Sequence, residues 1–318
     1  MRLSLPVLLP VALGIPLCLG LALWAQTPAT TPPSAIDNSQ PEANFSAGTT
    51  QVNVLFTVTD KKGRFVTDLT VNDFEVIENK KPQFIQQFTA ESDLPLRLGL
   101  LIDTSNSIRD KFRFEQQAAI RFMNDVIRPK DDRILLVGFD TAPVMVSDLT
   151  NDMEALEKGV NHMLPAGGTS LYDAIFFASD RLTKEQPREK FRRAMIVISD
   201  GDDTQSRYTR DQALEMAQKA DIVIYAISTD MSRAGSEGEL VLKYLAAETG
   251  GETFFPFKPE DLDQSFENIA NELRHQYNIF YHPDPLKTDG LYHPITVRVK
   301  TRKDLIVKAR HGYYAPKM

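Results

Sequence analysis

Five oxygen-bearing side chains, spread over three separated segments of the chain, are of the types that hold a small divalent cation. These residues are Asp103, Ser105, Ser107, Thr169 and Asp200. Mg²⁺ and Mn²⁺ prefer oxygen ligands in an octahedral arrangement, and Mg²⁺ usually keeps positions for water or an incoming ligand. Hydroxyl groups add no charge, so two carboxylates leave a bound dication electron-poor. A carboxylate from another protein could then complete the coordination, and the ion would serve as a point of attachment.

Each of the two aspartates ends an apolar run that is rich in strand-forming residues. Residues 96–103 form the first run and residues 193–200 form the second, and both predict a buried strand. In an open α/β sheet, ligands bind beyond the carboxyl ends of the parallel strands, where the strand order reverses. We therefore expect the two aspartates to be neighbours in space, although they are far apart in sequence.

This three-part pattern resembles the metal-ion-dependent adhesion site of von Willebrand factor type A domains. Asp103, Ser105 and Ser107 match the Asp-x-Ser-x-Ser motif of that family. Thr169 matches its loop threonine, and Asp200 matches the aspartate of its Asp-Gly turn. The resemblance covers about residues 94–276, and the ordered set is far more specific than Asp-x-Ser-x-Ser alone. It implies a protein-binding domain whose ion meets an acidic side chain of a protein partner.

Several acidic and hydroxyl residues also have a purely structural interpretation. Ser107 or Asp103 could cap a helix that starts near residue 108, and Ser170 with Asp173 forms a capping-box pattern for a helix over 171–183. Asp173 is therefore assigned to capping. Asp202 and Asp203 follow the Asp-Gly turn and are interpreted as a solvated acidic rim or as residues that support the ligands, rather than as ligands.

The overall charge of the chain bears on its partners. The 318 residues carry a formal net charge of −7, and 42% of them are apolar. The length is enough for one large core or two smaller ones. The sequence has no basic stripe that could neutralise phosphates, so we expect no nucleic-acid partner.

The N-terminal residues have the pattern of a secretory signal. A short positive end, Met1-Arg2, precedes an uncharged apolar run over 3–24, and small residues follow it. We therefore expect residues 1–25 to be a signal peptide and the protein to be exported. The length of the run leaves open an uncleaved segment, which would be the one contact with a membrane. Cys18 is the only cysteine, so a cleaved chain would have no disulfide and no thiol chemistry.

The next segments predict a linker and then half of a second, small domain. Residues 26–48 are mostly Thr, Pro, Ser, Ala and Asn, a composition that is typical of a disordered tether. Short strands are expected at 51–59, 74–78 and 85–88, and a matching set at 277–281, 295–300 and 305–310. Because half-sheets are unstable by themselves, we expect the segments 49–93 and 277–318 to combine into one antiparallel β-sandwich.

Residues 94–276 are expected to form the inserted domain, a doubly wound, Rossmann-like α/β fold with a mostly parallel sheet. The short turn at 141–143 predicts a hairpin and hence one antiparallel edge strand. The expected strands are 96–103, 134–140, 144–149, 194–199, 222–228 and 252–255. The expected helices are 108–127, 151–163, 171–183, 209–220, 239–249 and 259–275.

Motifs for enzymatic chemistry are absent from the sequence. It contains no phosphate-binding Gly-x-x-x-x-Gly-Lys loop, no Gly-x-Ser-x-Gly elbow and no His-Glu-x-x-His helix. We therefore expect a non-enzymatic binding module. Two alternatives stay open: a structural scaffold in a cell-envelope complex, and a metal-assisted hydrolase that uses Asp202 or Asp203 as the base.

Overall fold

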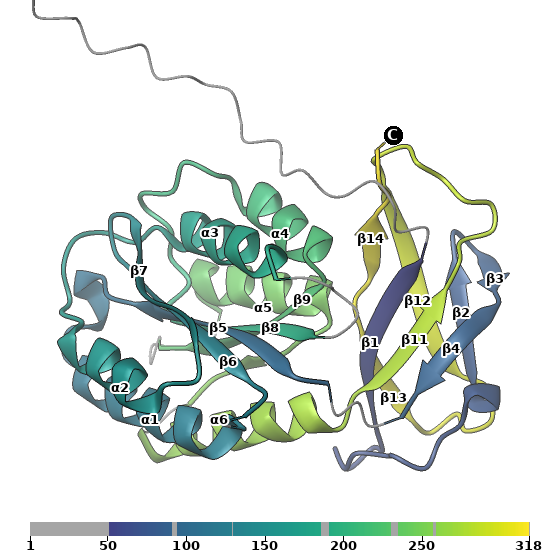
Figure 1. Ribbon diagram of the computed structural model, residues 1–318, viewed down its shortest axis with the longest axis horizontal. Coiled ribbons are helices and arrows are strands. Elements are labelled where there is room, and N and C mark those ends of the chain that lie inside the picture. Colours follow the sequence, from purple (N-terminus) through teal and green to yellow (C-terminus); the bar gives the residue numbers. More distant parts are fainter. Residues whose placement is uncertain are drawn as a thin grey trace, which may run out of the picture. The chain divides into compact units, whose positions relative to one another are not determined.

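A computed structural model describes residues 51–90, 94–128, 130–185, 191–229, 235–256 and 259–317. The predicted signal peptide and linker lie outside these residues. Within the described part of the chain, a six-stranded α/β sheet lies between two layers of helices, and strands from both chain ends build two further antiparallel sheets (Figure 1). The predicted fold class is therefore confirmed. No helix in the described ranges is long and apolar enough to cross a membrane.

The six-stranded sheet has the strand order β10-β9-β8-β5-β6-β7, and only β7 runs antiparallel to its neighbour. The predicted hairpin of β6 and β7 is therefore confirmed. The strands are β5 (Leu96–Asp103), β6 (Arg133–Phe139), β7 (Pro143–Thr150), β8 (Arg192–Ser199), β9 (Ile222–Ser228) and β10 (Thr253–Phe254). The helices are α1 (Phe112–Val126), α2 (Met153–His162), α3 (Leu171–Thr183), α4 (Arg210–Lys219), α5 (Glu237–Thr249) and α6 (Pro259–Arg274).

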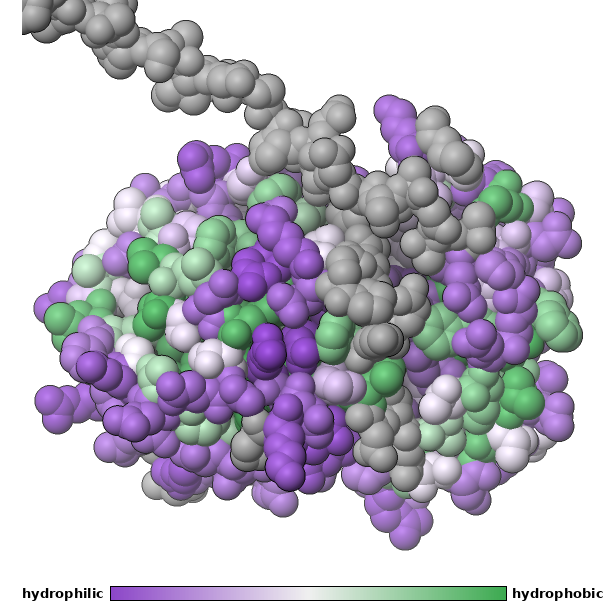
Figure 2. Space-filling model, in the orientation of Figure 1, coloured by the Kyte–Doolittle hydropathy of each residue, from purple (hydrophilic) through white to green (hydrophobic). Residues whose placement is uncertain are grey.

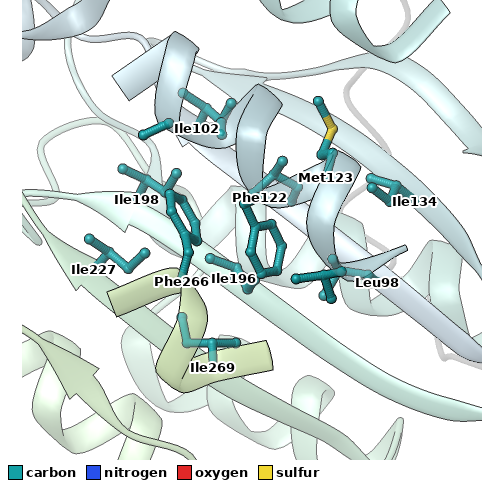
Figure 3. Close-up of a cluster of buried hydrophobic side chains, with 14 of the residues drawn as sticks. Leu98, Ile102, Phe122, Met123, Ile134, Ile196, Ile198, Ile227, Phe266 and Ile269 are labelled. Carbon is teal, nitrogen blue, oxygen red and sulfur yellow. The ribbon is translucent and has the colours of Figure 1, made fainter. Parts of the chain in front are cut away.

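Alternating side chains of the central strands supply the two cores on either side of this sheet. Leu98, Leu100 and Ile102 of β5 pack against α1, α2 and α6, whereas Leu101 packs against the layer of α3, α4 and α5. Figure 3 shows the first of these cores, in which the rings of Phe122 and Phe266 stack with centroids 4.6 Å apart. Because both faces of the strands are buried, they read as continuous apolar runs in the sequence.

The element boundaries follow the sequence closely, with one informative exception. The helix expected from residue 108 begins at Phe112, because a short 3-10 helix over Asn106–Ile108 comes first. This turn belongs to the segment with the two candidate serine ligands. The α-helix therefore begins several residues after the chain has left β5, once the short 3-10 turn is complete.

Strands from both chain ends interleave in the two smaller sheets, whose orders are β13-β1-β11-β4 and β14-β12-β2-β3. In the first sheet, β1 pairs with both β11 and β13, and in the second β2 pairs with β12. Two strands, β3 and β14, were not predicted, because each has only three residues. The strands are β1 (Val52–Thr59), β2 (Phe74–Glu78), β3 (Lys81–Gln83), β4 (Ile85–Thr89), β11 (Tyr277–Tyr281), β12 (Tyr292–Val299), β13 (Ile306–Ala309) and β14 (Gly312–Tyr314).

Basic side chains of the C-terminal strands contact acids of the α/β part. Lys308 forms ion pairs with Glu252 and Glu272, and Arg310 Nη1 lies 2.7 Å from Asp221 Oδ1. Asp221 directly precedes β9, Glu252 precedes β10, and Glu272 lies in the last turn of α6. These contacts therefore lie at the end of the large sheet where its parallel strands begin, and the carboxyl ends of the strands are at the other end.

A buried carboxylate holds four strands of the small sheets together. Glu78 at the end of β2 accepts hydrogen bonds from the hydroxyls of Tyr281 (2.9 Å) and Tyr313 (3.3 Å). His293 Nδ1 of β12 lies 3.1 Å from the same carboxylate. Burial raises the pKa of both tyrosines, so they stay protonated and act as donors.

Removing one of these donors should destabilise the fold without disturbing its shape. We expect Tyr281→Phe to lower the free energy of unfolding by about 1–3 kcal/mol, because Glu78 stays buried with one donor fewer. Urea denaturation measures the difference. The control is Tyr208→Phe, whose half-buried ring stacks on Phe176 and whose change should stay within about 0.5 kcal/mol. Equal losses in the two variants would contradict the role of Glu78.

Candidate metal centre

Two neighbouring parallel strands deliver the two aspartates to one place. Asp103 is the last residue of β5 and Asp200 directly follows β8, and the pairing of the two strands runs up to Ile102 opposite Ile198. The loop with Thr169 is attached to the same point, because the amide of Ala166 donates to the carbonyl of Thr104 at 2.7 Å. The three predicted segments therefore meet at the carboxyl ends of β5 and β8.

Hydrogen bonds connect four of the five predicted ligands. Ser107 Oγ donates to Asp200 Oδ2 at 2.7 Å and lies 2.9 Å from Ser105 Oγ. The amide of Ser105 donates to Asp103 Oδ1 at 2.8 Å. Asp103 and Ser105 are buried, whereas Ser107 is exposed. The group of oxygens therefore runs from the interior to the surface, where a partner can reach it.

The fifth predicted ligand, Thr169, is placed by its backbone. Its carbonyl accepts hydrogen bonds from the amides of Thr204 and Gln205, both at 2.9 Å. The Asn106 side chain also donates to the carbonyl of Gly167 at 3.1 Å, which holds the Thr169 loop against the Ser105 segment. Among the contacts of the described residues, no hydrogen bond joins the Thr169 side chain to the other four predicted ligands.

The electrostatics of this group favour a cation. Burial, together with the nearby charge of Asp200, raises the pKa of Asp103 to about 6, against the hydrogen bonds from Ser199 and Ser105 that lower it. Within the described ranges, no group of three or more His, Cys, Asp and Glu side chains is placed to hold a metal ion. A cation here would therefore depend on hydroxyl as well as carboxylate ligands, and this oxygen-only donor set fits Mg²⁺ or Mn²⁺.

Ser199 supports the site but was missed by the sequence analysis. Its hydroxyl donates to Asp103 Oδ2 at 2.6 Å and accepts from the amide of Gly201 at 3.1 Å. It therefore connects the end of β5 with the turn that carries Asp200. In the sequence Ser199 looks like one more residue of a strand, and only the pairing of β5 with β8 shows which carboxylate its hydroxyl faces.

The capping assignment of Ser170 and Asp173 was wrong. The Ser170 side chain makes no capping hydrogen bond to α3. Asp173 Oδ1 instead accepts from the amides of Arg207 and Tyr208, both at 2.9 Å. Asp173 therefore fixes the loop that follows Asp200, because that loop folds back over the start of α3 and offers two unpaired amides.

Asp203 makes hydrogen bonds at the start of α3. It accepts from the amide of Tyr172 at 3.3 Å and from the hydroxyl of Ser206 at 2.6 Å. Its carboxylate is half-buried, whereas Asp202 is exposed. Asp203 therefore ties the Asp200 loop to the helix, and the amide of Asp202 donates to Asp200 Oδ1 at 3.2 Å. The interpretation of both residues as rim or supporting residues, and not as ligands, stays a prediction.

The glycine after Asp200 is required by close packing as well as by its conformation. Gly201 has φ +87°, and a Cβ at this position would lie 2.2 Å from the carbonyl oxygen of Gly238 in the first turn of α5. Any side chain here would push α5 away from the turn. The start of α5 therefore holds the Asp200 turn in position.

Glu115 of α1 is a second buried acid near the site, and the sequence analysis did not identify it. It is 2% exposed, and neither carboxylate oxygen has a hydrogen-bond partner in the described part of the chain. Burial raises its pKa to about 8, helped by the charges of Asp103 and Asp200 and opposed by Lys111. A carboxylate at this position lowers the stability of the fold whenever it is ionised.

The pH dependence of stability should reveal Glu115. Its folded pKa lies above the ordinary value of 4.5, so the folded protein binds more protons, and the free energy of unfolding falls as the pH rises from about 5 to about 8. In the presence of EDTA, we expect Glu115→Met to reduce this slope, most of all between about pH 6 and pH 8, and to gain roughly 2–4 kcal/mol at pH 8. Asp103, whose pKa is raised to about 6, contributes part of the slope that remains at lower pH. Urea titrations at several pH values measure it. Asp125→Asn, on the exposed side of α1, is the control, and an unchanged slope in Glu115→Met would contradict the assignment.

Comparisons with known proteins identify the family of the α/β part of the chain. The family model of the von Willebrand factor type A domain matches residues 98–272, which is more than half of the chain. No curated protein matches the sequence significantly.

Three solved structures illustrate the similarity. A von Willebrand factor type A protein from Catenulispora acidiphila is 12% identical, with 74% of each chain covered and a TM-score of 0.49. The vWF domain of the type V pili tip protein Mfa5 from Porphyromonas gingivalis is 16% identical, with 57% of this chain and 95% of that chain covered and a TM-score of 0.47. The PilB minor pilin from Streptococcus sanguinis is 14% identical with a TM-score of 0.46, and the match covers 58% of this chain and 62% of the pilin.

Proposed function

Because the chain belongs to the von Willebrand factor type A domain family, we propose that it is a protein-binding module that holds its partner through a divalent cation. The ion, Mg²⁺ or Mn²⁺, would be bound by the five predicted ligands and completed by an acidic side chain of a protein partner. These ligands are Asp103, Ser105, Ser107, Thr169 and Asp200. The observation that carries the proposal is the connected set of oxygens from Asp103 to Asp200 at the exposed end of β5 and β8.

Each part of the site has a separate task in this proposal. The buried Asp103 carboxylate is fixed by Ser199 and Ser105, so it does not need to reorient when an ion binds. Ser107 lies at the surface and is the ligand nearest to an incoming group. When bound, the ion supplies a positive charge of high density, to which a partner carboxylate is attracted.

Binding fits the surroundings of this site better than catalysis. A hydrolase would need a free base beside the ion, but Asp203 is engaged with Tyr172 and Ser206. His162 lies at the end of α2 and contacts the carbonyl of Lys158, and His293 lies in the small sheets beside Glu78. Of the two acids in the hydrolase alternative, Asp203 is therefore the weaker candidate for a base.

We further propose that the module is exported and presented on a stalk. Residues 1–25 would be the signal peptide and residues 26–48 the linker, followed by the β-sandwich of 49–93 and 277–318 with the α/β domain of 94–276 inserted in it. In this arrangement the sandwich contacts lie at the end of the sheet away from Asp103 and Asp200. A scaffold in an envelope complex would use the same architecture without dependence on the ion.

Metal binding tests the site directly. We expect Mg²⁺ or Mn²⁺ to raise the thermal stability of the protein, by roughly 2.7 kcal/mol when the free ion is at a hundred times its dissociation constant. Asp103→Ala and Asp200→Ala should abolish both this shift and the heat of binding in calorimetry, while still unfolding cooperatively. Asp202→Asn is the matched control and should bind the ion normally. Unchanged metal affinity in both alanine variants would refute the site.

Capture of partners separates binding from the alternatives. The chain is immobilised and exposed to a cell-envelope extract with Mg²⁺ or with EDTA, and the bound proteins are identified by mass spectrometry. Metal-mediated binding predicts partners that are lost with EDTA and in Asp103→Ala. Identical partners under all conditions would indicate the scaffold. Metal-dependent turnover of a phosphoester or peptide panel that is lost in Asp202→Asn would indicate the hydrolase.

A further inference from the structure

Apolar side chains reach the surface beside the candidate metal centre, on the side of β7 and α2. Val144 of β7 is 59% exposed and Leu164, in the loop after α2, is 78% exposed, while Met163, which directly precedes Leu164, is 7% exposed. We call these three residues the apolar shelf. Figure 2 shows hydrophobic surface among hydrophilic residues in the region of β7.

The packing around Gly138 of β6 shows that Val144 and Met163 are neighbours, and Leu164 directly follows Met163 in the chain. A Cβ added to Gly138 would lie 3.7 Å from Met163 Sδ and 3.6 Å from the Thr104 methyl group. Val144 is paired directly with Gly138 in the antiparallel hairpin, so its side chain lies on the same face of the sheet. The absence of a side chain at Gly138 thus brings Val144, Met163 and Thr104 around one point.

Strand register gives the distance from the shelf to the metal centre. Asp103 is paired with Phe139 of β6, and Phe139 is paired with Pro143 of β7. Two strand spacings of about 4.8 Å each separate Asp103 from β7, or roughly 10 Å in total. An extended peptide rises about 3.3 Å per residue, so about three residues span this distance.

A basic residue lies between the two features. Arg109 is exposed, and its Nη2 donates to Asn106 Oδ1 at 2.7 Å and approaches the carbonyl of Pro165 at 3.4 Å. These bonds hold the loop after α2, at Pro165, against the segment with the serine ligands. A cation and an arginine beside an apolar surface are complementary to a segment that carries both an acidic and an apolar side chain.

We propose that the partner binds as an extended segment that places an acidic side chain on the ion and a bulky apolar side chain, about three residues away, on the shelf of Val144, Met163 and Leu164. This inference rests on the proposed function and specifies its partner. The acid provides attachment, and the apolar residue sets the direction in which the segment crosses the end of the sheet.

Peptide selection tests the proposal. Random phage-displayed peptides are selected on the full chain in Mg²⁺ and eluted with acid, and the enriched peptides are synthesised for calorimetry with Mg²⁺ or with EDTA. We expect Asp or Glu with Leu, Ile, Met or Phe about three positions away. Leu164→Asp should weaken these peptides at least about tenfold, because it replaces an apolar contact by a charge. Its Mg²⁺ affinity without peptide should stay unchanged.

Two exposed leucines serve as matched controls. Leu291→Asp changes a residue of the sandwich that is 63% exposed and should leave peptide affinity unchanged. Leu240→Asp changes a residue of α5 that is 58% exposed, two positions after the Gly238 that contacts the Asp200 turn. It should also have no effect, because it lies on the other side of the site.

The remaining outcomes would overturn the inference in distinguishable ways. Peptides that resist EDTA and still bind Asp200→Ala would refute the proposed function as well. Peptides that need Mg²⁺ but show no apolar preference, or that lose affinity in Leu240→Asp and not in Leu164→Asp, would refute the shelf and leave the metal site standing. Self-association in Mg²⁺ that Leu164→Asp abolishes, seen by analytical ultracentrifugation, would assign the shelf to a second copy of the chain and refute the peptide segment.

Discussion

The pairing of β5 with β8 is the constraint on which the site depends. It ends with Asp103 and Asp200 at the same edge of the sheet, where two carboxylates lie beside each other and one of them is fully buried. Like charges at such a place destabilise the fold unless something compensates for them. The hydroxyls of Ser105, Ser107 and Ser199 offset part of this cost, and a bound dication would offset the remainder.

The loops around the site are held by polar contacts that leave the ligands themselves free to act. Asp173 and Asp203 fix the loop that follows Asp200, and neither is part of the proposed ligand set. Gly201 and Gly238 allow α5 to press directly on the turn. The loops of the candidate centre are therefore held by residues behind it, and a partner of the proposed site would meet ligands that are already in position.

The two small sheets contact the α/β domain at the end opposite to the candidate site. Their strands come from both chain ends, so the α/β domain begins and ends at nearly the same place, and both connections leave from that side. Lys308 and Arg310 attach the sheets to acids at the end of the large sheet where its strands begin. The carboxyl ends of the strands, with the candidate ligands and the apolar shelf, are thus not used by these contacts.

The sequence by itself determined the longer strands, the helices and the identities of the proposed ligands. Long apolar runs are buried on both faces and long amphipathic segments are helical, and both signals are local. Three-residue strands such as β14 gave no such signal, because their pairing partner and not their own pattern makes them strands.

Only the tertiary structure decided which partners the polar side chains have. Asp173 looked like a helix cap and instead holds a loop more than thirty residues away, and Ser199 looked like a strand residue and instead fixes Asp103. Glu115, within the helix expected from residue 108, is a buried acid without a hydrogen-bond partner in the described part of the chain. Hydrophobic burial follows a residue's own type and period, whereas a hydrogen bond depends on which distant atom the fold brings within about 3 Å.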